Sequence, residues 1–179
     1  MKNEFIKLSA VLCAITLVAG LLLAGVNEIT APRIAEAEKN AAVEAMQKIL
    51  PDAENFTELS EYVSEAKSGN ENIGYCVKVS SNGYGGAIVM MVGFDSDLKV
   101  QGIEILSHSE TAGLGAKITE ESFKEQFSDK EPLLQVVKGN AKSSSQISAV
   151  TGATISSRAV ASGIEAAYKL VQEAKGETK

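Results

Sequence analysis

Four hydroxyl side chains lie close together in the stretch TGATISS, residues 151–157: Thr151, Thr154, Ser156 and Ser157. Serine and threonine favour the first positions of a helix, and glycine favours the turn before it. A helix N-terminus also presents unpaired N–H groups and a partial positive charge, which stabilise a phosphate. The stretch therefore predicts either an ordinary helix cap or a phosphate site in which a threonine hydroxyl binds the phosphate or is esterified by it.

A second unusual segment is HSETAGLGAKI, residues 108–118. Gly113 and Gly115 allow the backbone to approach a flat ligand closely and to expose its N–H groups. The segment lacks the third glycine of a dinucleotide fingerprint, so its spacing alone favours an ordinary loop. His108 is the only histidine of the chain, and no nucleophile is paired with it. A hydrogen bond to the loop or to a ligand edge is therefore expected of it rather than general-base catalysis.

Composition argues against several kinds of function. The chain has 17 basic and 23 acidic residues and a net charge of −6, without a basic run that contains aromatic residues, which leaves nucleic-acid binding little electrostatic basis. Its two cysteines, Cys13 and Cys76, provide neither a disulfide framework nor the spacing of a metal or iron–sulfur site. We therefore expect no metal site and no catalytic residue.

Residues 8–26, LSAVLCAITLVAGLLLAGV, form an uncharged segment. A membrane-spanning helix needs about 20 apolar residues, whereas the apolar part of a signal peptide usually has about 7 to 15. The sequence therefore favours a retained anchor over a cleaved signal. Lys2 and Lys7 precede the segment and Asn27 and Glu28 follow it, which predicts a cytoplasmic N-terminus and a domain on the outer side.

The segments that must position the two loops alternate between helical and strand patterns. A helix is predicted from near Thr30 to before Pro51, as a stalk or as a helix packed on the core. Three antiparallel strands are predicted at residues 74–81, 85–95 and 98–106, with Tyr84, Gly85 and Gly86 at a hairpin corner.

The remaining part of the chain predicts a short helix capped by Thr119, a strand at residues 132–139, and a long helix from Ser156 or Ser157 to about residue 174. An apolar stripe follows one face of the long helix: Val160, Ile164, Ala167 and Val171. The predicted fold is α+β, with one N-terminal transmembrane helix and one domain whose twisted, mostly antiparallel sheet is packed by helices. We expect residues 1–7 to form a cytoplasmic N-terminus, residues 8–26 the transmembrane helix, residues 27–52 a helical stalk and residues 53–179 the domain.

Two motifs resemble a known family. TGATIS, residues 151–156, matches the Ser/Thr-Gly-Ala-Thr-x-Ser/Thr flavinylation motif of the FMN-binding domain family. HSETAGLG, residues 108–115, resembles the His-x-Glu-Thr-Pro-Gly-Leu-Gly loop of the G subunit of the Rnf complex. With the N-terminal span, the strand region at residues 83–94 and the final helix, the resemblance covers nearly the whole chain.

The resemblance implies that FMN is bound covalently, through its phosphate, to Thr154 by a separate flavin transferase that uses FAD and magnesium. It implies two further groups of cofactor-binding residues: Thr151, Gly152, Ala153 and Ser156 near the phosphate, and His108, Glu110, Thr111, Gly113, Leu114 and Gly115 around the isoalloxazine. Two positions depart from the family pattern: Ser148 stands where relatives often have Asp, which bears on recognition by the transferase, and Ala112 replaces a proline, which only loosens a turn.

By the same resemblance, the chain is a membrane-anchored electron carrier of a ferredoxin:NAD⁺ oxidoreductase complex that moves Na⁺ or H⁺. Its expected partners are the other membrane and peripheral subunits. The flavin supplies the redox chemistry, so the chain is not expected to be catalytic alone. Two alternatives remain: a flavoprotein like the C subunit of the Na⁺-translocating NADH:quinone oxidoreductase, and an anchored adaptor without flavin.

Overall fold

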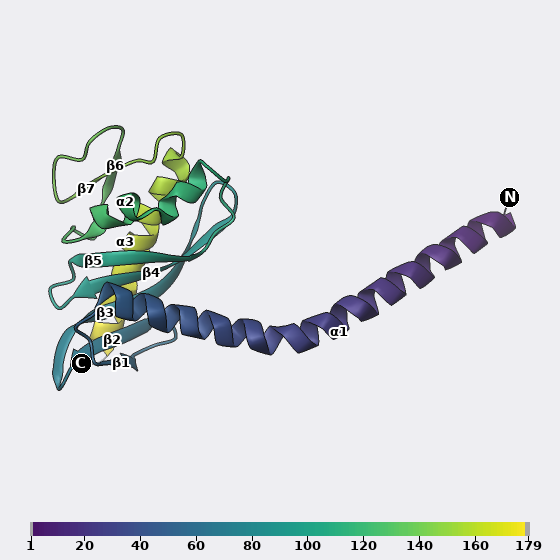
Figure 1. The fold of residues 1–179 in the computed structure, drawn as a ribbon, viewed down its shortest axis with the longest axis horizontal. Coiled ribbons are helices and arrows are strands. Elements are labelled where there is room, and N and C mark those ends of the chain that lie inside the picture. The colour runs from purple at the N-terminus through teal and green to yellow at the C-terminus, as the bar shows by residue number, and fades with distance from the viewer. Residues whose placement is uncertain (1, 178–179) are drawn as a thin grey trace. The chain divides into compact units, whose positions relative to one another are not determined.

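The structure is a computed structural model that describes residues 2–177 of the chain. Its first element is a long helix, α1 (Lys2–Ile49), and its last is a second long helix, α3 (Thr154–Glu177). The strands and several short helices lie between them (Figure 1). The chain divides into two compact units, Met1–Ala41 and Ala42–Lys179.

The first unit consists of most of α1. An 18-residue window of this helix has a mean hydropathy of 2.4 and none of it is buried, so by length and composition α1 can cross a membrane. The prediction that a separate helix begins near Thr30 was wrong, because α1 continues through this region with Pro32 inside it.

The continuity of α1 has a local explanation. The Thr30 hydroxyl does not cap a new helix but donates a hydrogen bond of 2.9 Å to the carbonyl oxygen of Val26, one turn earlier. A proline inside a helix removes one backbone hydrogen bond and costs about 3 kcal/mol. The alanine- and glutamate-rich residues that follow have high helix propensity, and they carry the helix on to Ile49.

The second unit is built on a five-stranded antiparallel sheet in the order β1-β2-β3-β4-β5. The strands are β1 (Asn55–Glu58), β2 (Val63–Ser68), β3 (Glu71–Asn82), β4 (Ala87–Asp95) and β5 (Val100–Ser107). The three predicted strands correspond to β3, β4 and β5, and the predicted corner at Tyr84 connects β3 to β4. Strands β1 and β2, which are short and largely polar, were not predicted.

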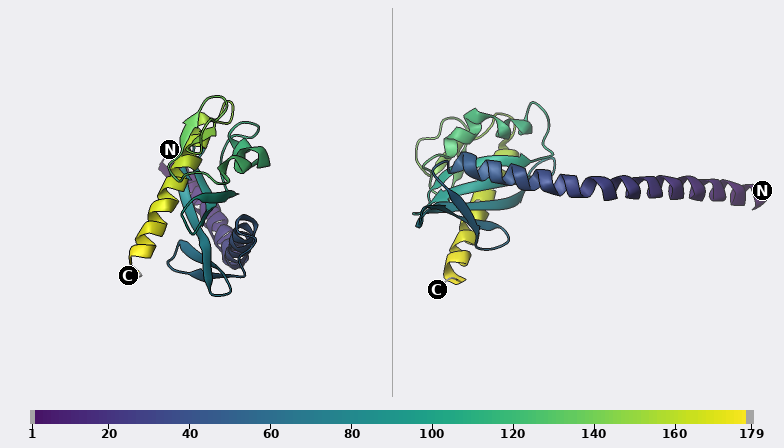
Figure 2. Two further views of the ribbon diagram at one scale, coloured as in Figure 1. Left: turned by 90° about the vertical axis from the view of Figure 1, so that its left-hand side faces the viewer. Right: turned by 60° about the horizontal axis from the view of Figure 1, so that its bottom comes forward.

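Helices cover both faces of this sheet. On one face lies α3, whose predicted apolar stripe is confirmed: Val160, Ile164, Ala167 and Val171 are fully buried in the larger core. On the other face, Ala45 and Leu50, at the end of α1 and just after it, are buried with Cys76 and Met91. The left view of Figure 2 shows the strands between α3 and the last turns of α1.

Glycine residues of the sheet make room for the end of α1. A Cβ atom at Gly93 of β4 would lie 2.2 Å from Cγ2 of Ile49, and one at Gly102 of β5 would lie 3.4 Å from the same atom. Ile49 therefore packs directly against the backbone of β4, which a larger residue at position 93 would prevent.

The segment between β5 and α3 carries short elements: η1 (Gly115–Thr119), α2 (Glu121–Lys124), η2 (Glu125–Phe127), β6 (Gln135–Val137) and β7 (Gln146–Ser148). The prediction of Thr119 as a helix cap was wrong, because Glu120 is the N-cap of α2 and the Thr119 hydroxyl donates to the carbonyl oxygen of Ala116 at 2.8 Å. The predicted strand at residues 132–139 is shorter, and it pairs with β7 in parallel, outside the main sheet.

We predict that Gly93→Ala destabilises the second unit by about 1–3 kcal/mol, because the added methyl group overlaps Ile49. Urea unfolding of the full chain in detergent measures the free-energy difference. Gly176→Ala is the control, since nothing lies within 4 Å of a Cβ atom there. In an Ile49→Ala background the cost of Gly93→Ala should fall; an unchanged cost would show that the two positions are not coupled.

Candidate functional site

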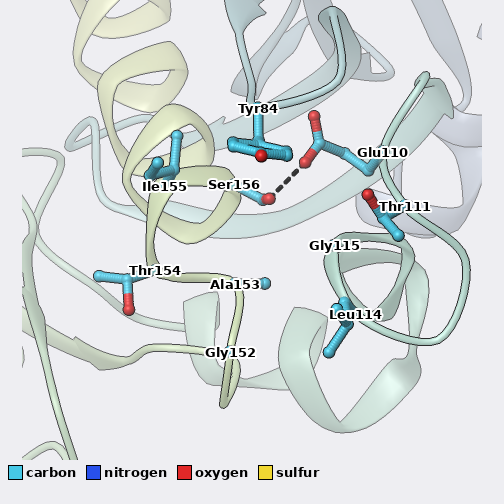
Figure 3. Close-up of a pocket in the computed structure, with 10 residues that line it drawn as sticks. All are labelled: Tyr84, Glu110, Thr111, Leu114, Gly115, Gly152, Ala153, Thr154, Ile155 and Ser156. Atoms are coloured by element: carbon cyan, nitrogen blue, oxygen red, sulfur yellow. Dashed lines mark hydrogen bonds between the residues drawn. The ribbon is translucent and has the colours of Figure 1, made fainter.

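Three segments that are distant in the sequence surround one pocket of about 440 Å³. They are the hairpin corner between β3 and β4, the loop between β5 and η1, and the turn that leads into α3 (Figure 3). The lining residues are Tyr84, Glu110, Thr111, Leu114, Gly115, Gly152, Ala153, Thr154, Ile155 and Ser156. The pocket thus joins the two loops whose residue types suggested a ligand site.

Most of the predicted cofactor-binding residues line this pocket. The exceptions are His108, Gly113 and Thr151, which belong to the same two loops but are not among the lining residues. Two lining residues were missed, Tyr84 and Ile155. An aromatic residue within a glycine-rich corner and an apolar residue within a polar motif were the available signals, since neither position needs such a side chain for a turn or a cap.

The hydroxyl groups of the TGATISS stretch differ in their burial and in their hydrogen bonds. Ser156 is 1% exposed and donates its hydroxyl hydrogen to the Glu110 carboxylate. Ser157 is fully buried, donates to the carbonyl oxygen of Ala153 at 3.0 Å and accepts from the N–H of Val150 at 3.0 Å. Thr154 is half-buried in the pocket wall, and among residues 2–177 no hydrogen bond engages its hydroxyl. Of the two hydroxyls that this stretch contributes to the pocket wall, that of Thr154 is therefore the one free to react.

The turn before α3 holds Thr154 at the helix N-terminus. Gly152 has φ +81°, a left-handed conformation that favours glycine, and Ala153 is buried behind it. The N–H groups of Thr154, Ile155 and Ser156 precede the first intrahelical hydrogen bond, so they can donate to an anion at the helix end. This end of the pocket suits a phosphate.

In contrast to this polar end, the rim of the pocket is apolar. Tyr84, Leu114 and Ile155 are 72%, 49% and 54% exposed, and these three large side chains gather around one pocket. Figure 3 shows Tyr84 and Ile155 on one side of the pocket and Leu114 on the other. Together with the phosphate-binding end, this rim fits an amphipathic ligand that has a flat apolar ring system and a phosphate.

Glu110 is the charged residue of the pocket wall. It is 8% exposed, and its carboxylate accepts hydrogen bonds from the Ser156 hydroxyl and, at 3.0 Å, from the N–H of Gly85. Burial raises the pKa of Glu110, but these hydrogen bonds, together with one from the N–H of Tyr84, outweigh burial. The pKa of the Glu110 carboxyl therefore lies below its usual value, and the group is ionised at neutral pH.

His108 bonds its own loop, as predicted: its Nδ1 accepts the N–H of Glu110 at 3.1 Å. This bond fixes the backbone of the loop at the residue that carries the buried carboxylate.

Comparison with known proteins gives the chain its family. The sequence model of the FMN-binding domain matches residues 83–169, and that of the RnfG N-terminal region matches residues 1–49. The G subunit of the proton-translocating ferredoxin:NAD⁺ oxidoreductase complex of Clostridium ljungdahlii is 34% identical over 172 residues, which cover 95% of this chain and 93% of that protein. The chain belongs to the RnfG family.

A second G subunit also matches nearly the whole chain. The G subunit of the Na⁺-translocating ferredoxin:NAD⁺ oxidoreductase complex of Acetobacterium woodii is 34% identical over 189 residues, covering 93% of this chain and 91% of that protein. As an RnfG protein, the chain is a membrane-anchored electron-transfer subunit with an FMN-binding domain.

Solved structures with the same fold confirm the predicted fold class. NqrC of Shewanella oneidensis superposes with a TM-score of 0.56 at 19% identity, over 66% of each chain. The C subunit of the Na⁺-translocating NADH-quinone reductase of Parabacteroides distasonis gives a TM-score of 0.52 at 24% identity, over 59% of this chain and 57% of that one.

The low pKa of Glu110 leads to a prediction about acid stability. A lowered pKa in the folded state contributes stability that is fully present above the unfolded value of about 4.3 and is lost as the pH falls through the folded value. Glu110→Gln should therefore be less stable than wild type at pH 7, by about 1–3 kcal/mol, and the difference should shrink below about pH 4.3. Urea unfolding between pH 7 and 3 measures this; a difference that does not depend on pH would contradict it.

Proposed function

We propose that the chain carries one FMN in this pocket, linked by a phosphoester to Oγ1 of Thr154, and passes electrons within an Rnf-type complex. The observation that supports this proposal is the state of the hydroxyls: Thr154 is free in the pocket wall, whereas Ser156 and Ser157 are buried and hydrogen-bonded. When bound, FMN supplies the chemistry of accepting and donating electrons.

In the proposed attachment reaction, a flavin transferase binds FAD, and FAD donates its FMN half. Oγ1 of Thr154 forms the new bond to the phosphorus of the FMN half, the bond to the AMP half breaks, and the hydroxyl proton leaves with the departing AMP or a base of the transferase. Gly152 and Ala153 carry small side chains next to the hydroxyl, which leaves access for that enzyme. The first N–H groups of α3 then donate to the phosphate oxygens.

The rest of the pocket has the composition that a flavin ring needs. Tyr84, Leu114 and Ile155 provide apolar contact, and Thr111 and the backbone near Gly115 provide polar atoms at the wall. Of the other predicted residues, we propose that Thr151, His108 and Gly113 act through the conformation of their loops, because they lie outside the lining.

A C-subunit-like flavoprotein is the less favoured alternative. The G subunits match this chain over more than nine-tenths of their length, whereas the likeness to the C subunits is in fold. A non-flavinylated adaptor does not account for a free threonine beside a pocket of this size.

We predict that the wild-type chain, produced with a flavin transferase, gains one FMN, and that Thr154→Ala abolishes the covalent flavin without unfolding the domain. Intact-protein and peptide mass spectrometry locate the group. Thr57→Ala is the matched control, because Thr57 is an exposed threonine of β1, and it should load fully. Flavin on Ser156 or Ser157, or no flavin on the folded wild type, would overturn the assignment and, in the second case, favour the adaptor.

We also propose that residues 8–26 span the membrane, that residues 27–52 follow as a helical segment, and that residues 53–179 form the flavin domain outside the cytoplasm, with residues 1–7 inside. The support is that Lys2 and Lys7 lie before the span, whereas Asn27 and Glu28 follow it directly and the next basic residue is Arg33. The partners would be the other membrane and peripheral subunits of the complex, with ferredoxin and NAD⁺ as the terminal redox partners of the whole assembly.

This topology predicts a labelling pattern. A membrane-impermeant maleimide is applied to cells from which the barriers outside the cell membrane have been removed. It should label Ser144→Cys, on an exposed loop, but not Asn3→Cys. The native thiols give little background, because Cys13 lies in the proposed span and burial raises the pKa of Cys76 to about 12. Labelling of Asn3→Cys alone would reverse the orientation.

A further inference from the structure

The Glu110 carboxylate connects the three segments that form the pocket. It belongs to the loop between β5 and η1, accepts the N–H of Gly85 from the hairpin corner, and accepts the hydroxyl hydrogen of Ser156 from the first turn of α3. Gly85 and Ser156 are 25 and 46 residues away from it in the sequence. One carboxylate thus holds together parts of the chain that no strand pairing joins.

Glycines surround this carboxylate and give it room. A Cβ atom at Gly83 would lie 2.2 Å from Oε1 of Glu110, and one at Gly115 would lie 2.6 Å from Oε2. A side chain at position 115 would therefore collide with the Glu110 carboxylate. This gives the glycine a structural reason that is separate from the approach of a ligand. On the hairpin side, Gly85 lies against the backbone of the same loop, because a Cβ atom there would lie 2.1 Å from the carbonyl oxygen of Ser109.

We propose that Glu110 is a positioning residue that assembles the pocket before the flavin arrives, and that its charge then makes the flavin harder to reduce. The first part follows from the bonds to Gly85 and Ser156, and Figure 3 shows the bonded Ser156–Glu110 pair beside Tyr84. The second part rests on the proposed function, because adding electrons to a flavin next to a fixed negative charge costs Coulomb energy.

Local hydrogen exchange in the flavin-free full chain, kept in detergent, tests the assembly. In Ser156→Ala and Glu110→Gln the amide of Gly85 should exchange up to about tenfold faster, since a charge-assisted hydrogen bond is lost or weakened. Glu58→Gln, an exposed glutamate of β1, and Ser162→Ala, an exposed serine of α3, are the matched controls and should leave the exchange unchanged. Wild-type exchange in both test variants would overturn the role in assembly, whether or not the chain takes up flavin.

The reduction potential of the loaded chain provides a readout that a purely structural role would not move. Glu110→Gln keeps the side-chain shape and removes the charge, so at a fixed ambient potential the ratio of reduced to oxidised flavin should rise several-fold. Ser156→Ala keeps the charge and should move this ratio less. A Glu110→Gln protein with the potential of wild type and of Glu58→Gln would overturn the electrostatic role. A wild-type chain that takes no flavin would instead contradict the assignment of Thr154.

Discussion

The burial of one face of α3 against the sheet is the interaction on which the site depends. Val160, Ile164, Ala167 and Val171 repeat at the spacing of helical turns and are inaccessible to solvent, so rotation of α3 about its axis would expose at least part of this stripe. The rotation of the helix in turn decides which hydroxyl of its first turn faces inward. Ser157 is directed into the protein and Ser156 toward the Glu110 carboxylate, whereas Thr154 lies half-buried in the pocket wall.

Hydrophobic periodicity accounts for what could be predicted of this fold. Strands β3, β4 and β5 and the stripe of α3 have strong apolar patterns, and the structure contains all of them. β1 and β2 have weaker patterns: β1 is an exposed edge strand that needs few apolar residues, and β2 has only two, Val63 and Ala66. At Pro32 the cost of a proline was outweighed by the helix propensity of its neighbours, which a local rule for helix ends does not include.

The site was predictable where chemistry and backbone requirements coincide. The glycine and hydroxyl residues of the two loops could be selected from the sequence, and most of them line one pocket. The pairing of Glu110 with Ser156 could not, because it joins residues 46 positions apart that meet only after the sheet and α3 have packed. Tyr84 was likewise assigned to a turn, since its direction depends on the loops that lie opposite it.

The last turns of α1 act as part of the domain core, which limits where the chain can be cut. A soluble fragment that begins at residue 53 would retain all five strands, but it would lose Ala45, Ile49 and Leu50. Met91 and the backbone of Gly93 would then face water, and the uncovered apolar face would favour self-association. A fragment that begins near Ala42 retains this cover and omits the apolar segment, so it is the suitable form for crystallisation and for electrochemistry in solution.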